Sequence, residues 1–513
     1  MFYRKIFDAV TRPGKRIRDQ FKSKEELDIL DGPVASNLFY LSLPIIVINL
    51  LQTAYNIADT FWLGQLSDVA LAAITFAFPL VFFLISLGMG LSVAGSVLVA
   101  QFEGKGNGDK VDYAASQTVT FSLAASIILG LFGYFFIGDI VNLMGASTAA
   151  ASAATGYLQI ISTGIFFMFG FFVFMSLMRG YGDTVTPMLL MFFSVVLNII
   201  LDPFLIFGWS IFPQMGVEGA AVATVFSRGL AMLVGLGILF SGRKGVEISL
   251  SDMYPDLSFF RKMLNIGVPA SIEGTGRSVS VNLLVAVIGL TFAQTIVSGY
   301  GIAVRIFSLI FLPATAIGKG VETMTGQNLG AGNKERAEKA ANAGAKYTFL
   351  VLTAIGAVTF TFAYPISAVF TKSPEVAAVA AEFLRYVSFS FGFIGVLRSY
   401  TGSFRGAGAT ITAAIISVGT LGAIRLPIAY IGAQNIGTVG VWIAFFVSNT
   451  GGALIAYFWY QRGGWKNKDI TEESQQKGEV AEDVEDFGGT ISDYFREKIG
   501  SILSTIPGTV PSR

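Results

Sequence analysis

The chain of 513 residues contains no cysteine and no histidine. The absence of cysteine excludes a disulfide framework, a thiolate nucleophile and a thiolate metal site. The absence of histidine removes the commonest metal ligand and the one side chain whose ordinary pKa lies near neutrality. Any coupling to protons or cations must therefore use carboxylates, assisted by hydroxyls, amides and backbone carbonyls.

Charged residues are also scarce, at 13% of the chain, whereas hydrophobic residues make up 53%. A water-soluble protein usually carries about twice this fraction of charge. The mean hydropathy is +0.64, and long apolar runs recur along the chain. The sequence therefore predicts an all-α protein that crosses the membrane many times. The basic N-terminus lacks the apolar core of a signal peptide, so the first span is expected to act as the insertion signal.

Twelve apolar segments are long enough to cross a bilayer as helices. They cover approximately residues 37–62, 69–101, 113–138, 152–178, 186–208, 217–241, 262–290, 294–327, 340–370, 377–403, 409–431 and 436–461. Lysine and arginine gather in the N-terminal arm and in alternate connections, for example at Lys105, Arg243 and Lys334. By the positive-inside rule, these connections and both termini are cytoplasmic.

The second half of the chain repeats the first. Arg-Gly-Tyr-Gly at 179–182 recurs as Arg-Gly-Ala-Gly at 405–408. Each copy is expected to end a span at the cytoplasmic face, where the glycines permit a tight turn and the arginine satisfies helix-end carbonyls. The motif that begins at Gln101 recurs at Gln327, and the offset between the two copies is the same for both motifs. Two halves with an even number of spans insert with the same orientation. We therefore expect two six-helix lobes related by a pseudo-two-fold axis along the membrane normal, with a cavity between them.

This repeat divides the chain into five parts: a cytoplasmic basic arm (1–35), a first lobe (36–241), a cytoplasmic inter-lobe loop (242–261), a second lobe (262–462) and a cytoplasmic tail (463–513). Apolar residues on one face of the arm fit either a surface helix or a solvated basic segment. In the tail, an acidic linker precedes residues 491–506, whose periodicity predicts an amphipathic helix.

The most informative stretch runs from Leu50 to Gly64, inside the first apolar span. It contains Gln52, Asn56 and Asp59, whose spacing places them on one face of a helix. A carboxylate at membrane depth costs ~2.5 kcal/mol or more and usually carries a proton or an ion. The alternative is an aspartate that neighbouring donors hold for helix packing.

Span five supplies a second intramembrane acid. Asn198 and Asp202 share one helix face, and Pro203 removes a backbone donor, which leaves a carbonyl one turn back free to turn toward a ligand. Thr224 lies at a comparable depth in span six. With Asp59, these side chains offer oxygen ligands that suit Na+. Alternatively, the two carboxylates share one proton, or Asp202 only caps or kinks its helix.

The second half lacks both acids, since Leu284 stands near the position that matches Asp59, and Arg425 and Leu426 stand near the position that matches Asp202. Its charged span residues are instead mainly cationic: Arg277, Arg305, Lys319, Arg398 and Arg425 against Glu273 and Glu322. Each is expected to be structural, for example in an i, i+4 pair of Glu273 with Arg277. Together they are also compatible with a site for anionic or zwitterionic groups. The candidate substrate-cavity residues are Gln52, Tyr55, Asn56, Phe167, Phe171, Glu273, Arg277 and Arg398.

Several motifs resemble the multidrug and toxic compound extrusion (MATE) family, in particular its prokaryotic DinF-like branch. They are Gln52-Thr-Ala-Tyr-Asn-Ile-Ala-Asp59, Asn198-Ile-Ile-Leu-Asp202-Pro, Gly216-Val-Glu-Gly-Ala-Ala-Val-Ala-Thr224, Arg179-Gly-Tyr-Gly-Asp and Gln327-Asn-Leu-Gly-Ala-Gly. The resemblance covers roughly residues 36–462. The second-half acids of the NorM-like branch are missing, and span four reads Phe171-Phe-Val-Phe-Met where some archaeal relatives carry asparagines.

The resemblance implies a two-lobed exporter in a prokaryotic plasma membrane, driven by inward flow of Na+ or H+. It implies that Asp59, Asn198, Asp202 and Thr224 form the cation site. The expected partners are amphipathic small molecules and membrane lipids, without nucleic acid, and we expect a monomer without a prosthetic cofactor. The sequence does not choose between Na+ and H+ and does not identify the substrate.

Three other functions share single features with this sequence. A flippase for lipid-linked sugars belongs to the same superfamily and would use the basic second half to bind phosphate. An intramembrane aspartyl protease would use Gly180-Tyr-Gly-Asp183, but the partner Tyr-Asp motif is absent and the repeat copy replaces the acid with Ala409. A major-facilitator transporter also has two six-helix halves, but Glu103-Gly-Lys-Gly-Asn-Gly-Asp109 matches its loop signature poorly. We therefore expect a transporter and not an enzyme.

Overall fold

The computed structural model describes residues 21–144, 147–468 and 470, except for the side chains of Leu87 and Leu143. Within these residues the regular structure is helical and contains no strand, as predicted. Most of the basic arm, the acidic linker from residue 471 and the expected tail helix at 491–506 lie outside the described residues.

The first bundle contains six long helices. They are α2 (Val34–Leu66), α3 (Asp68–Gly104), α4 (Gly108–Leu143), α5 (Thr148–Tyr181), α6 (Val185–Phe207) and α7 (Gly216–Phe240). Helix α5 packs against α3, α4 and α7, and most of its side chains are buried. Helix α6 packs between α2 and α7. This arrangement brings the polar residues of α2, α6 and α7 into one interior.

The second bundle begins with α8 (Leu257–Thr291), α9 (Gln294–Gly330) and α10 (Lys334–Thr361). It continues with shorter elements: α11 (Ala363–Ala368), α12 (Pro374–Ser388), α13 (Phe391–Gly406), α14 (Thr410–Val418), the π-helical η2 (Gly419–Arg425), α15 (Leu426–Ile436) and α16 (Thr438–Gln461). Aromatic rings fill its core. Tyr300 stacks on Trp442 with centroids 6.1 Å apart, and Phe383 meets Phe445 at 4.9 Å. These rings bury large apolar areas and fix the packing of α9, α12 and α16.

Local sequence explains where these helices start and stop. Ser67 Oγ accepts a hydrogen bond from the N–H of Ala70 at 3.1 Å, and this bond satisfies one of the unpaired donors at the start of α3. Gly182 ends α5 with φ of 101°, and Gly408, its counterpart in the second copy of the motif, has φ of 82° just after α13. Because side chains disfavour positive φ, the repeated motif needs glycine at this position, and the predicted turn role of these glycines is confirmed.

The helices account for the predicted number of spans. Eleven described helices are long and apolar enough to cross a membrane, and the count reaches twelve when α12 and α13 form one span. These two helices meet at a bend of 56°. Many large apolar side chains outside the bundle cores are exposed, such as Phe135 at 68% and Leu290 at 90%. Such surfaces suit contact with lipid rather than water.

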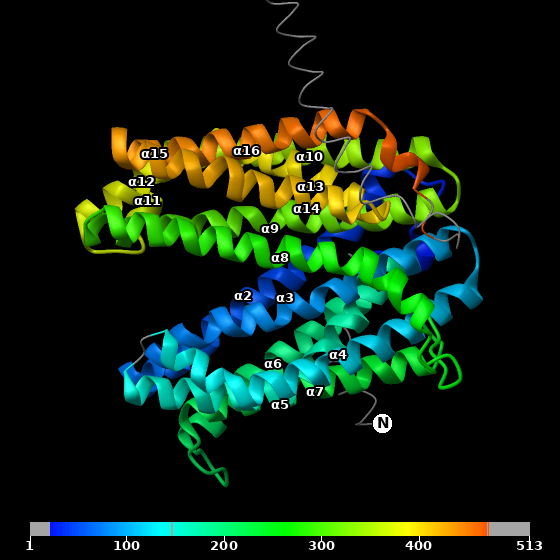
Figure 1. Cartoon of the computed structure of the whole chain (residues 1–513), viewed down its shortest axis with the longest axis horizontal. Helices are drawn as coiled ribbons and strands as arrows, with labels where there is room; N and C mark the ends of the chain where they lie inside the picture. The colour runs from blue at the N-terminus through cyan, green and yellow to red at the C-terminus, as the bar shows by residue number, and fades with distance from the viewer. Residues whose placement is uncertain (1–20, 145–146, 469, 471–513) are drawn as a thin grey trace, which may run out of the picture. The chain divides into compact units, whose positions relative to one another are not determined.

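The two bundles meet along α2 and α3 of the first and α8, α9 and α10 of the second. Helix α3 packs against α8 and α9, and α2 packs against α9 and α10 (Figure 1). The start and the end of α9 follow those of α3 by the same offset that separates the repeated motifs, so these two helices are equivalent elements of the repeat. The sequence repeat is therefore also a structural repeat, as predicted.

Candidate cation site and central cavity

The first bundle gathers the four predicted cation ligands. Asp59 lies on α2, Asn198 and Asp202 on α6, and Thr224 on α7. All four are buried, with Asp59, Asn198 and Asp202 fully inaccessible. Asn198 Nδ2 donates a hydrogen bond to Asp202 Oδ1 at 3.2 Å, as their i, i+4 spacing suggests.

The two acids and the Thr224 hydroxyl are joined by direct neighbours. The carboxyl groups of Asp59 and Asp202 lie close enough to interact directly. Tyr55, one turn before Asp59 on α2, also lies within reach of the Asp59 carboxyl. The Tyr55 hydroxyl and Thr224 Oγ1 share a hydrogen bond of 2.6 Å. Three helices therefore contribute to one continuous polar cluster.

This cluster holds more acceptors than donors. Both carboxyl oxygens of Asp59, Oδ2 of Asp202 and Oδ1 of Asn198 are buried, and none accepts a hydrogen bond of normal geometry from a described residue. Buried acceptors without partners are costly, and buried carboxylates more so. A proton shared between the acids or a cation bound among these oxygens would remove that cost, and oxygen ligands of this kind suit Na+.

Arg228 is a site residue that the sequence reading missed. It lies on α7 one turn after Thr224 and is buried. Its NH2 group donates to Gln52 Oε1 at 2.8 Å, and its guanidinium lies 5.2 Å from the centre of the Tyr55 ring and 5.5 Å from that of Phe171. Its position in the sequence could have indicated this role, because an arginine on the Thr224 face of an apolar span needs a polar partner. Arg228 links the cation cluster to Gln52.

Gln52 also lines a cavity between the two bundles. The cavity has a volume of about 260 Å³. Its wall on the side of the first bundle mixes apolar side chains with uncharged polar ones such as Asn49 and Ser86, and the apolar ones include Ile45, Met89, Phe172 and Met175. Its wall on the side of the second bundle carries charge: Glu273, Arg277, Lys319, Glu322, Arg398 and Arg405. Arg179 adds a further cation from α5.

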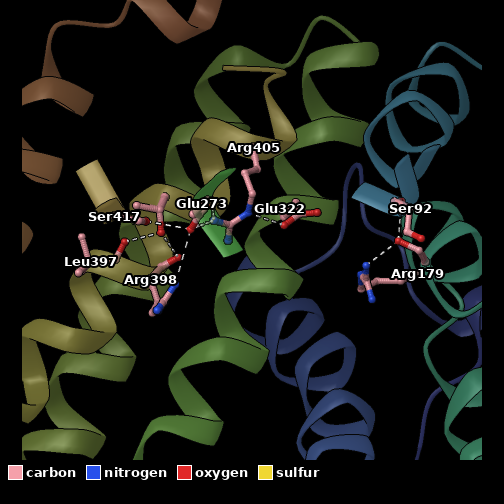
Figure 2. Close-up of polar contacts among 10 residues, drawn as sticks. Ser92, Arg179, Glu273, Glu322, Leu397, Arg398, Arg405 and Ser417 are labelled. Atoms are coloured by element: carbon pink, nitrogen blue, oxygen red, sulfur yellow. Dashed lines mark hydrogen bonds and ion pairs between the residues drawn. The ribbon is translucent and has the colours of Figure 1, made fainter. Parts of the chain in front are cut away.

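Arg405 forms ion pairs with both carboxylates of this cavity, Glu273 and Glu322 (Figure 2). Its NH1 group contacts both oxygens of Glu273 at 3.0 and 3.1 Å, and its Nε donates to Glu322 Oε2 at 3.0 Å. Arg398 lies 3.8 Å from Glu273, and Ser417 donates to it at 2.8 Å. The structure thus pairs Glu273 with Arg405 and Arg398 across helices, whereas the i, i+4 spacing had suggested Arg277. Arg405, expected to serve a helix end, is an ion-pair hub.

The residues expected to form a substrate cavity fall into two places. Gln52, Glu273, Arg277 and Arg398 line the central cavity. The other four lie in the first bundle outside its described lining: Tyr55, Asn56, Phe167 and Phe171. Asn56 accepts a hydrogen bond from Gln52 Nε2 at 3.2 Å, and the Phe167 ring packs against Gly229. Of these four, the Tyr55 and Phe171 rings lie against the Arg228 guanidinium, beside the cation cluster.

One end of the cavity is closed where the repeated motifs meet. Thr323 Oγ1 donates to the carbonyl of Arg179 at 3.1 Å, which ties α9 to the end of α5. Residues 21–33 also contact both bundles here. Lys24 pairs with Glu103 of the first bundle, and the carbonyl of Ile29 accepts from Arg336 Nε of the second at 3.1 Å. We call this region, which holds residues 101–104, 179–182, 327–330 and 405–408, the closed end.

Comparisons with known proteins agree with this architecture. The MatE family model matches residues 44–204 and 269–431. The probable multidrug resistance protein YpnP of Bacillus subtilis is 29% identical over 445 residues, which cover 86% of this chain and 97% of that protein. A protein named FAD transporter from Shewanella oneidensis is 26% identical over 441 residues, covering 86% of this chain and 97% of that protein.

Solved structures show the same fold. A crystal structure described as MATE in the bent conformation superposes with a TM-score of 0.81 at 26% identity, covering 88% of this chain and all of that one. A second, described as an outward-facing conformation of a multidrug resistance transporter, gives 0.79 at 27% identity, covering 87% of this chain and all of that one. Both matches extend across the two bundles.

Proposed function

The chain belongs to the MatE, or multidrug and toxic compound extrusion, family, and from this membership we propose that it exports amphipathic small molecules in exchange for inward-moving Na+ or H+. The family is one of transport proteins and not of enzymes. Relatives carry names such as multidrug resistance protein and FAD transporter. Their names therefore do not fix one class of cargo for this chain.

The observation that carries the proposal is the acceptor-rich cluster of Asp59, Asp202 and Asn198. Four of its buried oxygens have no hydrogen-bond donor among the described residues. A transported proton or Na+ would be held by these oxygens, with Thr224 as an additional hydroxyl ligand or donor. The cluster is buried, so it can exchange its ion only when the surrounding helices move.

Coupling follows from the path between the cluster and the cavity. Asp59 and Gln52 lie two turns apart on α2, and Arg228 joins Gln52 to the Tyr55 ring beside Asp59. Loading the acids with a cation changes the charge that Arg228 faces. We propose that this shifts α2, and with it the Gln52 wall of the cavity. Ion and substrate would then favour different states and exchange for one another.

We further propose that the closed end faces the cytoplasm. It carries the cationic connections, including Lys24, Lys105 and Arg336, and positive charge is retained on the cytoplasmic side. In this orientation both termini are cytoplasmic, the chain lies in the plasma membrane, and the state described here is closed toward the cytoplasm. Export would require the closed end to separate so that cargo can enter from inside.

Transport in proteoliposomes tests the proposal. Purified protein is reconstituted, and efflux of two fluorescent amphipathic dyes, one anionic and one cationic, is recorded under a sodium gradient alone and under a pH gradient alone. One gradient should drive efflux. Asp59→Asn and Asp202→Asn should each abolish driven efflux because they remove the charge that binds the ion.

Asp139→Asn is the matched control. Asp139 is exposed on α4, so the same chemical change there should leave efflux intact. Normal gradient-driven efflux in both Asp59→Asn and Asp202→Asn, with expression and folding unchanged, would refute the coupling role of the cluster.

A further inference from the structure

The central cavity has a surplus of positive charge. Its lining includes five cationic side chains, Arg179, Arg277, Lys319, Arg398 and Arg405, and two carboxylates, Glu273 and Glu322. Guanidinium groups remain protonated in proteins, so at least four of these cations persist at any physiological pH. The lining therefore cannot neutralise itself.

The two carboxylates are already engaged. Arg405 contacts both of them at about 3 Å, and Arg398 is the second partner of Glu273. Among the described residues, no carboxylate lies within ion-pair distance of Arg179, Arg277 or Lys319. These three cations thus have no carboxylate at ion-pair distance in the described part of the cavity wall.

Some of the donors are buried without any partner. Nε of Arg179 and Nε of Arg398 have no hydrogen-bond acceptor among the described residues, and Arg398 is only 7% exposed. Figure 2 shows Arg179 on the first bundle and Arg398 on the second, with Arg405 and its carboxylates between the helices of the second. Uncompensated buried cations are costly, and a bound anion is what would compensate them.

The opposite wall suits a different part of a ligand. Ile45, Met89, Phe172 and Met175 offer apolar contact from the first bundle. The Phe311 ring lies 4.6 Å from the guanidinium carbon of Arg398 and 5.9 Å from that of Arg277, so it orients both cations. A molecule with an apolar body and an anionic head would contact both walls at once.

We propose that the central cavity is a binding site for amphipathic anions, in which an apolar body lies against the first bundle and a phosphate or carboxylate lies among Arg179, Arg277 and Lys319. This inference rests on the proposed export function and names its substrate class. It predicts that cationic amphiphiles are poor ligands.

Three naphthalene compounds with one ring system and different charge test this. They are 1-naphthyl phosphate, neutral 1-naphthol and 1-naphthylmethylammonium. Binding to the full chain in a neutral maltoside detergent is measured by calorimetry, with the heat of protein-free micelles subtracted. The phosphate should bind at least 10-fold more tightly than either of the others, and inorganic phosphate alone should bind more weakly than naphthyl phosphate.

Variants locate the site. Lys319→Gln and Arg277→Gln should each weaken naphthyl phosphate binding about 10-fold, as expected for one charge-assisted contact, and leave 1-naphthol unchanged. Lys319→Arg should retain most of the affinity. Arg305→Gln removes a positive charge from an exposed position on α9, the helix of Lys319, and should change the binding of neither ligand. Melting curves identify any variant that fails to fold. If either Lys319→Gln or Arg277→Gln is misfolded, the other one provides the test.

The anionic head could belong to a free molecule or to a lipid. Competition with lysophosphatidylglycerol and with phosphate-free monoolein separates these sources, since displacement by the first alone identifies a lipid phosphate as a ligand. Equal binding of the three naphthalene compounds, preference for the ammonium, or equal losses in Lys319→Gln and Arg305→Gln would overturn the proposal. These binding measurements use no ion gradient, so they can succeed or fail independently of coupled transport.

Discussion

Gln101 and Gln327 make the same hydrogen bond in opposite directions between the two bundles. Gln101 Nε2 donates to the carbonyl of Gly406 at 3.0 Å, and Gln327 Nε2 donates to the carbonyl of Gly180 at 2.9 Å. The two glutamines occupy equivalent positions of the repeat, and so do the two glycines. The sequence repeat therefore places a reciprocal pair of bonds at the closed end, and both glutamines are buried.

Replacing both glutamines with leucine should open the closed end. Each change leaves a buried carbonyl without its donor, at a cost of about 1–3 kcal/mol. The double variant should therefore shift the population toward the open form by 10-fold or more. Since the chain has no cysteine, Ser92→Cys at the cavity wall provides a single label site. A membrane-impermeant maleimide applied to inside-out vesicles should label it faster in the double variant.

Gln434→Leu is the control for that measurement, because Gln434 is exposed on α15. It should leave the labelling rate unchanged. Equal labelling of Ser92→Cys with and without the two buried substitutions would show that the reciprocal bonds do not hold this end closed.

Glycine at 104 and 330 should be required for the same contact. A Cβ at Gly104 would lie 1.9 Å from the carbonyl oxygen of Gln327, and one at Gly330 would lie 2.0 Å from that of Gln101. Backbone atoms cannot move aside cheaply, so Gly104→Ala and Gly330→Ala should each cost about 1–3 kcal/mol in the closed state. Maleimide labelling of Ser92→Cys should rise in both. Gly108→Ala, which meets open space, should label like the parent, and protection in all three would contradict the close approach.

Asp256, outside the membrane-spanning segments, should stabilise the start of α8 in a pH-dependent way. A hydrogen bond of 2.7 Å from the Tyr113 hydroxyl, together with those from Ser258 and Phe259, lowers the pKa of Asp256 to about 2. Because the folded-state pKa is the lower one, the stabilisation is present above the ordinary pKa of about 3.9 and is lost as the pH falls toward 2.

Asp256→Ala should therefore destabilise the protein at pH 7 by about 0.5–2 kcal/mol, as expected for a lost helix cap. This loss should be seen as a lower melting temperature. The difference from the parent should shrink at pH 2.5. Tyr113→Phe removes the hydroxyl that donates to Asp256 and should lower the melting temperature at pH 7 by a smaller amount. A deficit in Asp256→Ala that is constant over this pH range would show that the charge of Asp256 is not involved.

The internal repeat made much of this fold predictable. The constant offset between the two copies of each motif identified equivalent turns, and the structure places positive-φ glycines at both copies, Gly182 and Gly408. Asp59 and Asp202 were recognisable because lipid excludes charge, so an acid in an apolar span must have a polar neighbour. Both lie in one buried cluster.

Contacts between distant helices were not predictable in the same way. The spacing of Glu273 and Arg277 describes one helix surface only, whereas the cation that binds Glu273 at the shortest distance, Arg405, comes from 132 residues away. Sequence gives no information on how α13 crosses α8. Arg228 was missed for a related reason, since its partner Gln52 lies on another helix and 176 residues earlier.

Arg228→Gln should tighten cation binding and slow transport. Arg228 brings positive charge close to Asp59 and opposes a second cation there, while its hydrogen bond to Gln52 links the acids to the cavity. Removing the charge should lower the sodium or proton concentration for half-maximal efflux several-fold, because like-charge repulsion in a low-dielectric interior is strong. The maximal rate should fall, since the ion leaves more slowly and the link to the cavity is lost.

Proteoliposome efflux measured over a range of ion concentrations separates these two effects, with Arg305→Gln as the matched loss of an exposed arginine. Arg228→Lys keeps the charge but loses the two-sided guanidinium contacts. It should therefore retain the parent's ion dependence and still show a reduced maximal rate. A higher half-maximal ion concentration in Arg228→Gln would mean that Arg228 favours ion binding instead of opposing it. Another residue would then have to link the acids to Gln52.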